Sequence, residues 1–322
     1  MSSASGEDRL IDWLRRKPGA ELVGNDAAVL PPGPYAVTVD HQIAGVHFPP
    51  DLDPALIARR LLAVNLSDLA AMGASPAFAF LALAAPEGFD HRRFFESLLE
   101  GCVRHGARLA GGDLARNPER LVASLTLMGT KEEGARWLER SGARPGHDLW
   151  LGGAVGESAL GRLLIERGAP ANLEAFSSSL RAPIRRAVRR HLEPRPQLDL
   201  GRMLARRSEG AAMDVSDGVA RDLHRLCKAS GVGAEVDAAA LPFSDRYFAI
   251  CEVIDADPLS LALGGGEDYV LLFTLPAGEE PPAAEARRIG TITAAEGGVT
   301  LLREGRRSPL PDTGWDHLTG PK

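Results

Sequence analysis

Apolar residues recur along this chain with two different spacings, and the changes between them predict strands and helices in turn. Short apolar or β-branched runs bounded by glycine or proline, such as residues 35–40 and 78–84, are typical of strands. The longer apolar stretch at residues 54–72 ends at Gly73 and predicts a helix. This alternation indicates an α/β chain with some α+β character. The same pattern predicts further helices at residues 8–17, 94–105, 157–167, 201–207 and 219–229, and further strands at 107–110, 121–129, 148–152, 210–215 and 269–275.

The pattern begins again after a charged segment at residues 131–144, which leads into Pro145-Gly146. A chain of 322 residues has room for about two domains of roughly 150 residues each. We therefore expect an N-terminal α/β domain over residues 1–135 and a C-terminal α/β domain over residues 136–322.

Composition narrows the possible partners. A content of 44% hydrophobic and 25% charged residues is ordinary for a globular protein, and a net charge of -6 speaks against nucleic acid or an anionic membrane as a partner. Gly73 and Pro76 divide the weakly charged stretch at residues 61–86 into pieces too short to span a bilayer, so we expect a buried core there. Three cysteines without a CxxC pair, and no visible secretory signal, favour a reducing, cytoplasmic setting.

The two commonest phosphate-binding loops do not occur in the sequence. No lysine lies in a GxxxxGK[ST] context, and the 35 glycines include no GxGxxG. A nucleotide would have to be bound by other means.

Several acidic residues lie in apolar or glycine-rich surroundings, where an isolated carboxylate is costly to desolvate. Asp68 lies in the middle of an apolar helix, where both helix propensity and solvation disfavour it. Asp40 ends an apolar strand, and Asp26, Asp113 and Asp214 have similar neighbours. Turn or cap roles stay open for Asp26, Asp40 and Asp113 taken singly. Together the set predicts a site for hard divalent cations such as Mg²⁺, which usually also keep phosphate ligands.

Other candidate features have an ordinary structural explanation beside the functional one. The glycines that precede Glu267 and Asp268 could let backbone amides approach a ligand, or could only form a tight turn into the next strand. His47 could be a packed or surface residue, and Trp315 a core residue. The arginine-rich run at residues 181–195 predicts a solvated helix face rather than a polyanion site.

The same acids and glycines belong to a series of motifs that spans about residues 20–318. The motifs are Gly24-Asn25-Asp26, Thr38-Val39-Asp40, Gly45-Val46-His47-Phe48, Asn65-Leu66-Ser67-Asp68, Gly111-Gly112-Asp113, Arg140-Ser141-Gly142-Ala143, Asp214-Val215-Ser216-Asp217-Gly218, Gly265-Gly266-Glu267-Asp268-Tyr269 and Gly314-Trp315-Asp316-His317. Their order resembles the thiamine-monophosphate kinase family. The Asn-Leu-Ser-Asp and Gly-Gly-Glu-Asp-Tyr motifs are shared with the wider superfamily of aminoimidazole ribonucleotide synthetase, whereas Gly-Val-His-Phe and Gly-Trp-Asp-His point to the thiamine branch.

The resemblance implies a two-domain fold like that of aminoimidazole ribonucleotide synthetase, with N-terminal sheets that pair into a barrel across a homodimer. It implies ATP-dependent phosphorylation of thiamine monophosphate to thiamine diphosphate, by direct in-line transfer assisted by several Mg²⁺ ions. By position, the implied metal ligands are Asp26, Thr38, Asp40, Asp68, Asp113, Asp214 and Asp217, and the catalytic acids among them are Asp26, Asp68, Asp113 and Asp214. The implied ATP ligands are Gly112, Asp113, Arg140 and Ser216, and the implied thiamine ligands are His47, Glu267 and Trp315.

Three positions depart from the family pattern. Asn25 stands where the family usually has a first Asp, His105 stands where a Tyr is common, and Leu114 follows the Gly-Gly-Asp motif in place of a Thr. These departures leave open a non-catalytic or altered-substrate ATP-binding paralogue of the same superfamily.

Overall fold

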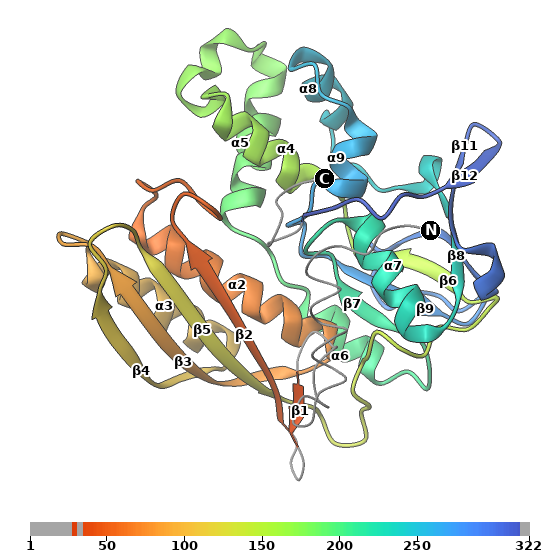
Figure 1. Cartoon of the computed structure of the whole chain (residues 1–322), viewed down its shortest axis with the longest axis horizontal. Coiled ribbons are helices and arrows are strands. Elements are labelled where there is room, and N and C mark those ends of the chain that lie inside the picture. Colours follow the sequence, from red (N-terminus) through yellow and green to blue (C-terminus); the bar gives the residue numbers. More distant parts are fainter. Residues whose placement is uncertain (1–27, 31–34, 316–322) are drawn as a thin grey trace.

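The computed structural model describes residues 28–30 and 35–315, which form two β-sheets with helices packed against each (Figure 1). The mixed α/β fold expected from the sequence is confirmed. The expected helix at residues 8–17 and the expected metal ligand Asp26 lie outside the described residues. With one exception described below, the other expected elements are present with ends that differ by a few residues.

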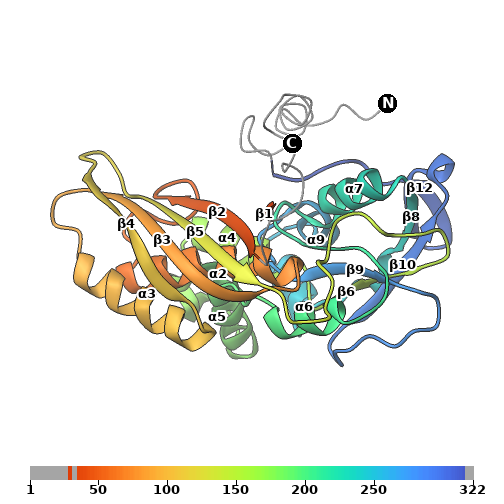
Figure 2. The same cartoon turned by 90° about the horizontal axis from the view of Figure 1, so that it is seen from below.

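The first sheet has the strand order β1-β2-β5-β3-β4 and is antiparallel except for the parallel pair β3 and β4. Two helices cover one of its faces (Figure 2). The elements of this half are β1 (Ala28–Leu30), β2 (Tyr35–Ile43), α2 (Pro54–Ala71), β3 (Ser75–Ala85), α3 (His91–His105), β4 (Arg108–Arg116) and β5 (Val122–Thr130).

Successive side chains of a strand point to opposite faces, so β2 presents one set of residues to α2 and another to the open face. Thr38 is buried against α2, whereas its neighbour Val39 is 59% exposed. Phe78 and Phe80 on β3 are 37% and 39% exposed. Within the described part of the chain, the face opposite the helices is therefore uncovered and exposes apolar side chains.

Strand β4 differs from the sequence-based expectation. The sequence predicts a strand that stops at residue 110, but β4 continues through Gly111, Gly112 and Asp113. A Cβ atom on Gly112 would lie 1.9 Å from the carbonyl oxygen of Leu81 on β3. Glycine is required here because the two strands approach so closely.

The second sheet has the order β12-β11-β8-β10-β6-β9-β7, and β8 and β11 are its parallel pair. None of the helices within the described ranges has the length and apolar character needed to cross a bilayer. The helices and strands of this half are β6 (Asp148–Leu151), α4 (Glu157–Glu166), α5 (Ser178–Leu192), α6 (Leu198–Ala205), β7 (Ala212–Asp214), α7 (Val219–Ser230), β8 (Gly233–Asp237), α8 (Tyr247–Val253), α9 (Pro258–Gly264), β9 (Leu271–Leu275), β10 (Arg287–Thr293), β11 (Val299–Arg303) and β12 (Arg306–Pro309).

Helix α2 packs against both halves, so one apolar core crosses the joint between them. Leu204 of α6 belongs to the same buried cluster as Leu69 of α2. The two helices are so close that a Cβ atom on Gly201 would lie 2.0 Å from the carbonyl oxygen of Ala70. The two sheets are connected by the segment between β5 and β6, within which residue 135 falls.

We expect Gly201→Ala to lower the free energy of unfolding by about 2 kcal/mol, because the clash is with backbone that cannot rotate away. The loss should occur even though alanine is the better helix former. Urea denaturation followed by circular dichroism measures it. The control is Gly297→Ala, at an exposed position where the nearest atom is Thr293 Oγ1 at 3.4 Å; it should change the unfolding free energy by less than about 0.5 kcal/mol. Equal stability of the two variants would contradict the close packing of α2 on α6.

Candidate active site

A cleft of about 910 Å³ lies between the two halves of the molecule. Its walls come from β2 and the turn that follows it, from α2 and α4, and from loops of the second half. The residues expected from the sequence that line it are Asp40, His47, Asp68, Arg140, Ser216, Asp217, Glu267 and Trp315.

Strand β2 supplies a row of polar side chains on the face that meets α2. Thr38 Oγ1 donates a hydrogen bond to Asp68 Oδ2. Two residues along, Asp40 lines the cleft. Two further along, Gln42 Oε1 accepts a hydrogen bond from Arg60 Nε at 2.8 Å. The alternation of the strand therefore places three polar residues on this face, two of which contact charged residues of the helix.

Helix α2 also connects to the end of β7. Ser67 Oγ donates to Asp214 Oδ2 at 2.6 Å, next to Asp68 in sequence. Thr38 and Asp214 are only 4% and 2% exposed, so they lie behind the cleft surface rather than on it. Two of the expected metal ligands are thus joined to α2 by hydrogen bonds, one from each half of the molecule.

The loop at Ser216 and Asp217 is shaped by Asp222, which the sequence analysis does not single out. Asp222 Oδ2 accepts hydrogen bonds from the backbone N–H groups of Ser216 and Asp217, both at 3.0 Å. Arg225 Nη1 lies 2.5 Å from Asp217 Oδ2 and 3.2 Å from Asp222 Oδ1. Burial, followed by the charge of Asp217, raises the pKa of Asp222 to about 7, and Arg225 opposes that shift.

The Gly-Gly-Glu-Asp-Tyr turn pairs with this loop. The N–H of Glu267 donates to the carbonyl of Ser216 at 2.7 Å, and the N–H of Tyr269 donates to Val215 at 2.9 Å. Gly266 has a left-handed φ of 68°, and a Cβ atom on it would lie 2.7 Å from the carbonyl oxygen of Ser216. Glycine is needed at this position because another segment of the protein is close by, which favours the structural explanation over close approach to a ligand.

The two acids of the turn point to different partners. Glu267 pairs with the buried Arg60, and Glu267 Oε2 lies 3.3 Å from Nδ1 of His191. Asp268 accepts hydrogen bonds at the start of α4, from the N–H of Gly156 at 2.7 Å and of Ser158 at 3.2 Å. Burial raises the pKa of Asp268 to about 7. Glu267 therefore lines the cleft, whereas Asp268 anchors the turn to the start of α4.

His47 and Trp315 lie on the cleft wall rather than in a core. The N–H of Ile43 donates to His47 Nδ1 at 3.0 Å, so the proton of the neutral ring resides on Nε2. The backbone N–H of Trp315 donates to the carbonyl of Asp217 at 3.1 Å. The guanidinium carbon of Arg162 lies 5.9 Å from the centroid of the Trp315 ring, within the range of a cation–π contact.

Gly112 and Asp113 are the described site residues that this chain does not bring to its own cleft. Asp113 shares a row across the open face with Ala82, Ser124 and His41, and of these His41 lines the cleft. Three strand spacings of 4.8 Å separate the ends of this row by about 14 Å. In Figure 1, β4 lies at the edge of the sheet farthest from the second half.

Five charged or ionisable residues of the site are not singled out by the sequence analysis. Arg60 gives a usable signal, since a charged residue inside an apolar helix needs a partner. The others lie on amphipathic helices, where their charge is typical of a solvated face. These residues are Arg60, Arg162, His191, Asp222 and Arg225.

Within the described ranges, no three His, Cys, Asp or Glu side chains lie close enough together to hold a metal ion by themselves. The donors near α2 are nevertheless all hard oxygens, from Thr38, Asp40, Asp68 and Asp214. Mg²⁺ commonly binds through one or two carboxylates and completes its coordination with water and substrate phosphates. The residues present therefore fit a magnesium ion that arrives with a phosphate ligand.

Comparisons with known proteins agree with this geometry. Residues 24–130 match the family described as AIR synthase related protein, N-terminal domain. A thiamine-monophosphate kinase of Salmonella typhimurium is 38% identical, over 93% of this chain and 92% of that protein. The solved structure of AaThiL complexed with AMPPCP and TMP has a TM-score of 0.86 and 29% identity, covering 97% of each chain. The thiamine-monophosphate kinase structure from Stenotrophomonas maltophilia has a TM-score of 0.74 and 35% identity, covering 94% of this chain and 96% of that one. The chain therefore belongs to the thiamine-monophosphate kinase family.

Proposed function

We propose that this protein transfers the γ-phosphoryl group of ATP to thiamine monophosphate and forms thiamine diphosphate. The observation that carries the proposal is the composition of the cleft. It joins the expected acceptor residues His47, Glu267 and Trp315 to the acids of α2 and β2 in one space. The AaThiL structure with its ATP analogue and TMP supports the same choice of substrates.

The acceptor side of the cleft suits a molecule that is cationic at one end and anionic at the other. Thiamine monophosphate combines a positively charged thiazolium ring with a phosphate. The carboxylate of Glu267 and the indole face of Trp315 favour a cation. The Nε2–H group of His47 is a donor for a phosphate oxygen. Donor and acceptor phosphates would then meet in the cleft beside Asp40 and Asp68.

On the donor side, Arg140 and Ser216 are the residues of the cleft proposed to bind ATP. A guanidinium recognises phosphate through a pair of hydrogen bonds, and a hydroxyl can donate one more. Asp222 holds the backbone of Ser216, so the position of that hydroxyl is set before ATP binds.

Thr38, Asp40, Asp68, Asp113, Asp214 and Asp217 are the described residues proposed to hold Mg²⁺, Asp113 from the partner subunit of the dimer proposed below. When bound, Mg²⁺ would neutralise the negative charge of the two phosphate groups that must approach each other. The attacking oxygen belongs to a phosphate that is already ionised, so the chain needs no strong general base. Its residues have to bind the two substrates, align their phosphates and exclude water, which accords with a site rich in Asp.

We further propose a homodimer formed through the open face of the first sheet. This face exposes Val39, Phe78 and Phe80, and its edge strand β4 carries Gly112 and Asp113. Exposed apolar faces of this kind are typical of subunit interfaces. With the two-fold axis along the strands, β4 of one copy would lie over β2 of the other. Asp113 would then complete the site of the partner subunit, about 14 Å from its place in a single chain.

The purified protein, mixed with ATP, Mg²⁺ and thiamine monophosphate, should form thiamine diphosphate, measured by chromatography. Asp68→Asn should lower kcat about 100-fold or more, because a charged group at the reacting phosphates is lost. The control Asp199→Asn removes a carboxylate that is exposed on α6 and pairs with Arg202; it should leave kcat within about twofold. ATP binding without turnover by the unaltered protein would instead support a non-catalytic paralogue.

Direct transfer predicts that no phosphorylated protein accumulates when the enzyme is incubated with γ-labelled ATP alone. Label should appear only in thiamine diphosphate, once the acceptor is added. Label retained by the denatured protein would contradict direct transfer and indicate a covalent intermediate.

If Asp113 acts across the dimer, mixed dimers should restore activity. Asp68→Asn and Asp113→Asn should each be nearly inactive alone. Coexpressed with different affinity tags, they should form heterodimers with one intact site, and an equal mixture should reach about a quarter of the unaltered activity. Heterodimers that are isolated through both tags and remain inactive would place Asp113 in the site of its own chain.

A further inference from the structure

We propose that Arg60 is a positioning residue for acceptor recognition, which holds the Glu267 carboxylate at the cleft from behind without contacting the substrate. The proposal rests on the proposed function, in which Glu267 binds thiamine monophosphate. It concerns a buried arginine that the sequence analysis does not single out.

The side chain of Arg60 is completely buried, in a helix made mostly of apolar residues. A cation in that position is stable only when its donors find acceptors. The guanidinium donates to Gln42 Oε1 at 2.8 Å, to the backbone carbonyl of His191 and to Glu267 Oε1. These three acceptors come from β2, from α5 and from the turn before β9. Arg60 therefore ties three separate parts of the cleft wall to one helix.

Arg60 rather than His191 supplies the positive charge beside Glu267. Burial, followed by the charge of Arg60, lowers the pKa of His191 to about 4, so its ring is neutral near pH 7. The ring can share a hydrogen bond with Glu267 but cannot compensate its charge.

Glu267 combines an unusual backbone conformation with a side chain held by Arg60. Its φ is 59°, in the left-handed region that residues other than glycine rarely adopt. Its side chain is 23% exposed, so the carboxylate reaches the cleft while one oxygen is held by Arg60. Without the arginine, the acid could move away from the place where an acceptor would meet it.

Arg60 also relates the acceptor site to Asp68, the acidic residue of the same helix. Asp68 lies eight residues farther along α2, which is about 12 Å along the helix axis. A single rigid element thus fixes the carboxylate proposed to bind the thiamine group and one proposed to lie at the phosphates. Arg60 thus relates the position of the Glu267 carboxylate to that of Asp68 through the helix.

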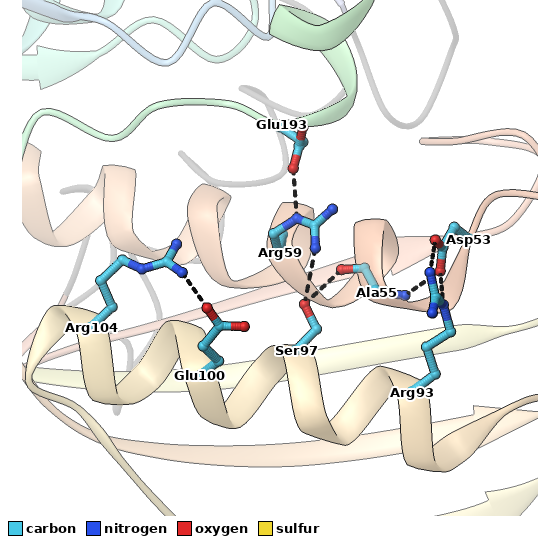
Figure 3. Close-up of polar contacts among 8 residues, drawn as sticks. All are labelled: Asp53, Ala55, Arg59, Arg93, Ser97, Glu100, Arg104 and Glu193. Carbon is cyan, nitrogen blue, oxygen red and sulfur yellow. Dashed lines mark hydrogen bonds and ion pairs between the residues drawn. The ribbon is translucent and has the colours of Figure 1, made fainter.

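The neighbouring Arg59 offers a matched control, and Figure 3 shows its surroundings. Arg59 also joins α2 to the region after α5, since its Nε lies 2.6 Å from Glu193 Oε1. It also lies 3.4 Å from Ser97 Oγ of α3. Its side chain is 39% exposed, and neither partner lines the cleft. Removal of Arg59 tests the loss of an ion pair between the two halves without disturbing Glu267.

The experiment compares steady-state kinetics of the unaltered enzyme with Arg60→Met, Arg60→Lys, Glu267→Gln and Arg59→Met. Arg60→Met should raise the KM for thiamine monophosphate at least about tenfold and leave the KM for ATP within about twofold. Arg60→Lys should give a smaller rise, because one ammonium cannot reproduce the fork of donors. Arg59→Met should change neither KM by more than about twofold. Arg60→Met added to Glu267→Gln should cause little further loss, since both act through one carboxylate.

Equal rises in both KM values, additive effects with Glu267→Gln, or the same result from Arg59→Met would overturn the proposal. If Arg60→Met does not fold, the result for Arg60→Lys decides, and an unchanged acceptor KM refutes the positioning role. A lack of turnover by the unaltered protein would refute the kinase assignment but not the role of Arg60. Calorimetric binding of thiamine monophosphate to the same variants then tests Arg60, and equal affinity of the unaltered protein and Arg60→Lys, or no binding by either, would refute its role.

Discussion

Helix α2 is buried between the two halves of the molecule, yet it carries the charged residues Arg60 and Asp68. A charged group inside a protein requires partners, and both residues have partners outside the helix. Strand β2 supplies Thr38 and Gln42 from one side. The second half supplies Glu267 and the backbone of His191 from the other. The partners that Arg60 and Asp68 require thus hold both halves of the molecule against α2. The cleft lies beside this contact.

This arrangement separates the residues that build the site from those that face its contents. Asp222 and Asp268 are buried acids that hold backbone N–H groups, and burial raises the pKa of both. Asp68 and Glu267 line the cleft and are held by groups in the wall behind them, among them Thr38 and Arg60. The buried acids keep the loops in place, so the acids at the surface need not reorganise when phosphates arrive.

Glycine has a related role in the structure. Gly112, Gly201 and Gly266 each lie where a Cβ atom would strike the backbone of another segment. These contacts join β4 to β3, α6 to α2, and the Glu267 turn to the loop at Ser216. At these three positions glycine serves close backbone packing at the joints that place the site.

The sequence by itself determined the alternation of strands and helices, the motifs, and most of the expected site residues that line the cleft. Periodicity and turn chemistry are local properties, and Asp68 in an apolar helix is conspicuous without any structure. Tertiary structure decided which carboxylates meet. It placed Asp113 on the far edge of the sheet, turned Asp268 away from the cleft and paired Glu267 with Arg60, a contact across 207 positions of the chain. Such pairings depend on strand order and helix packing, which no local pattern of residues encodes.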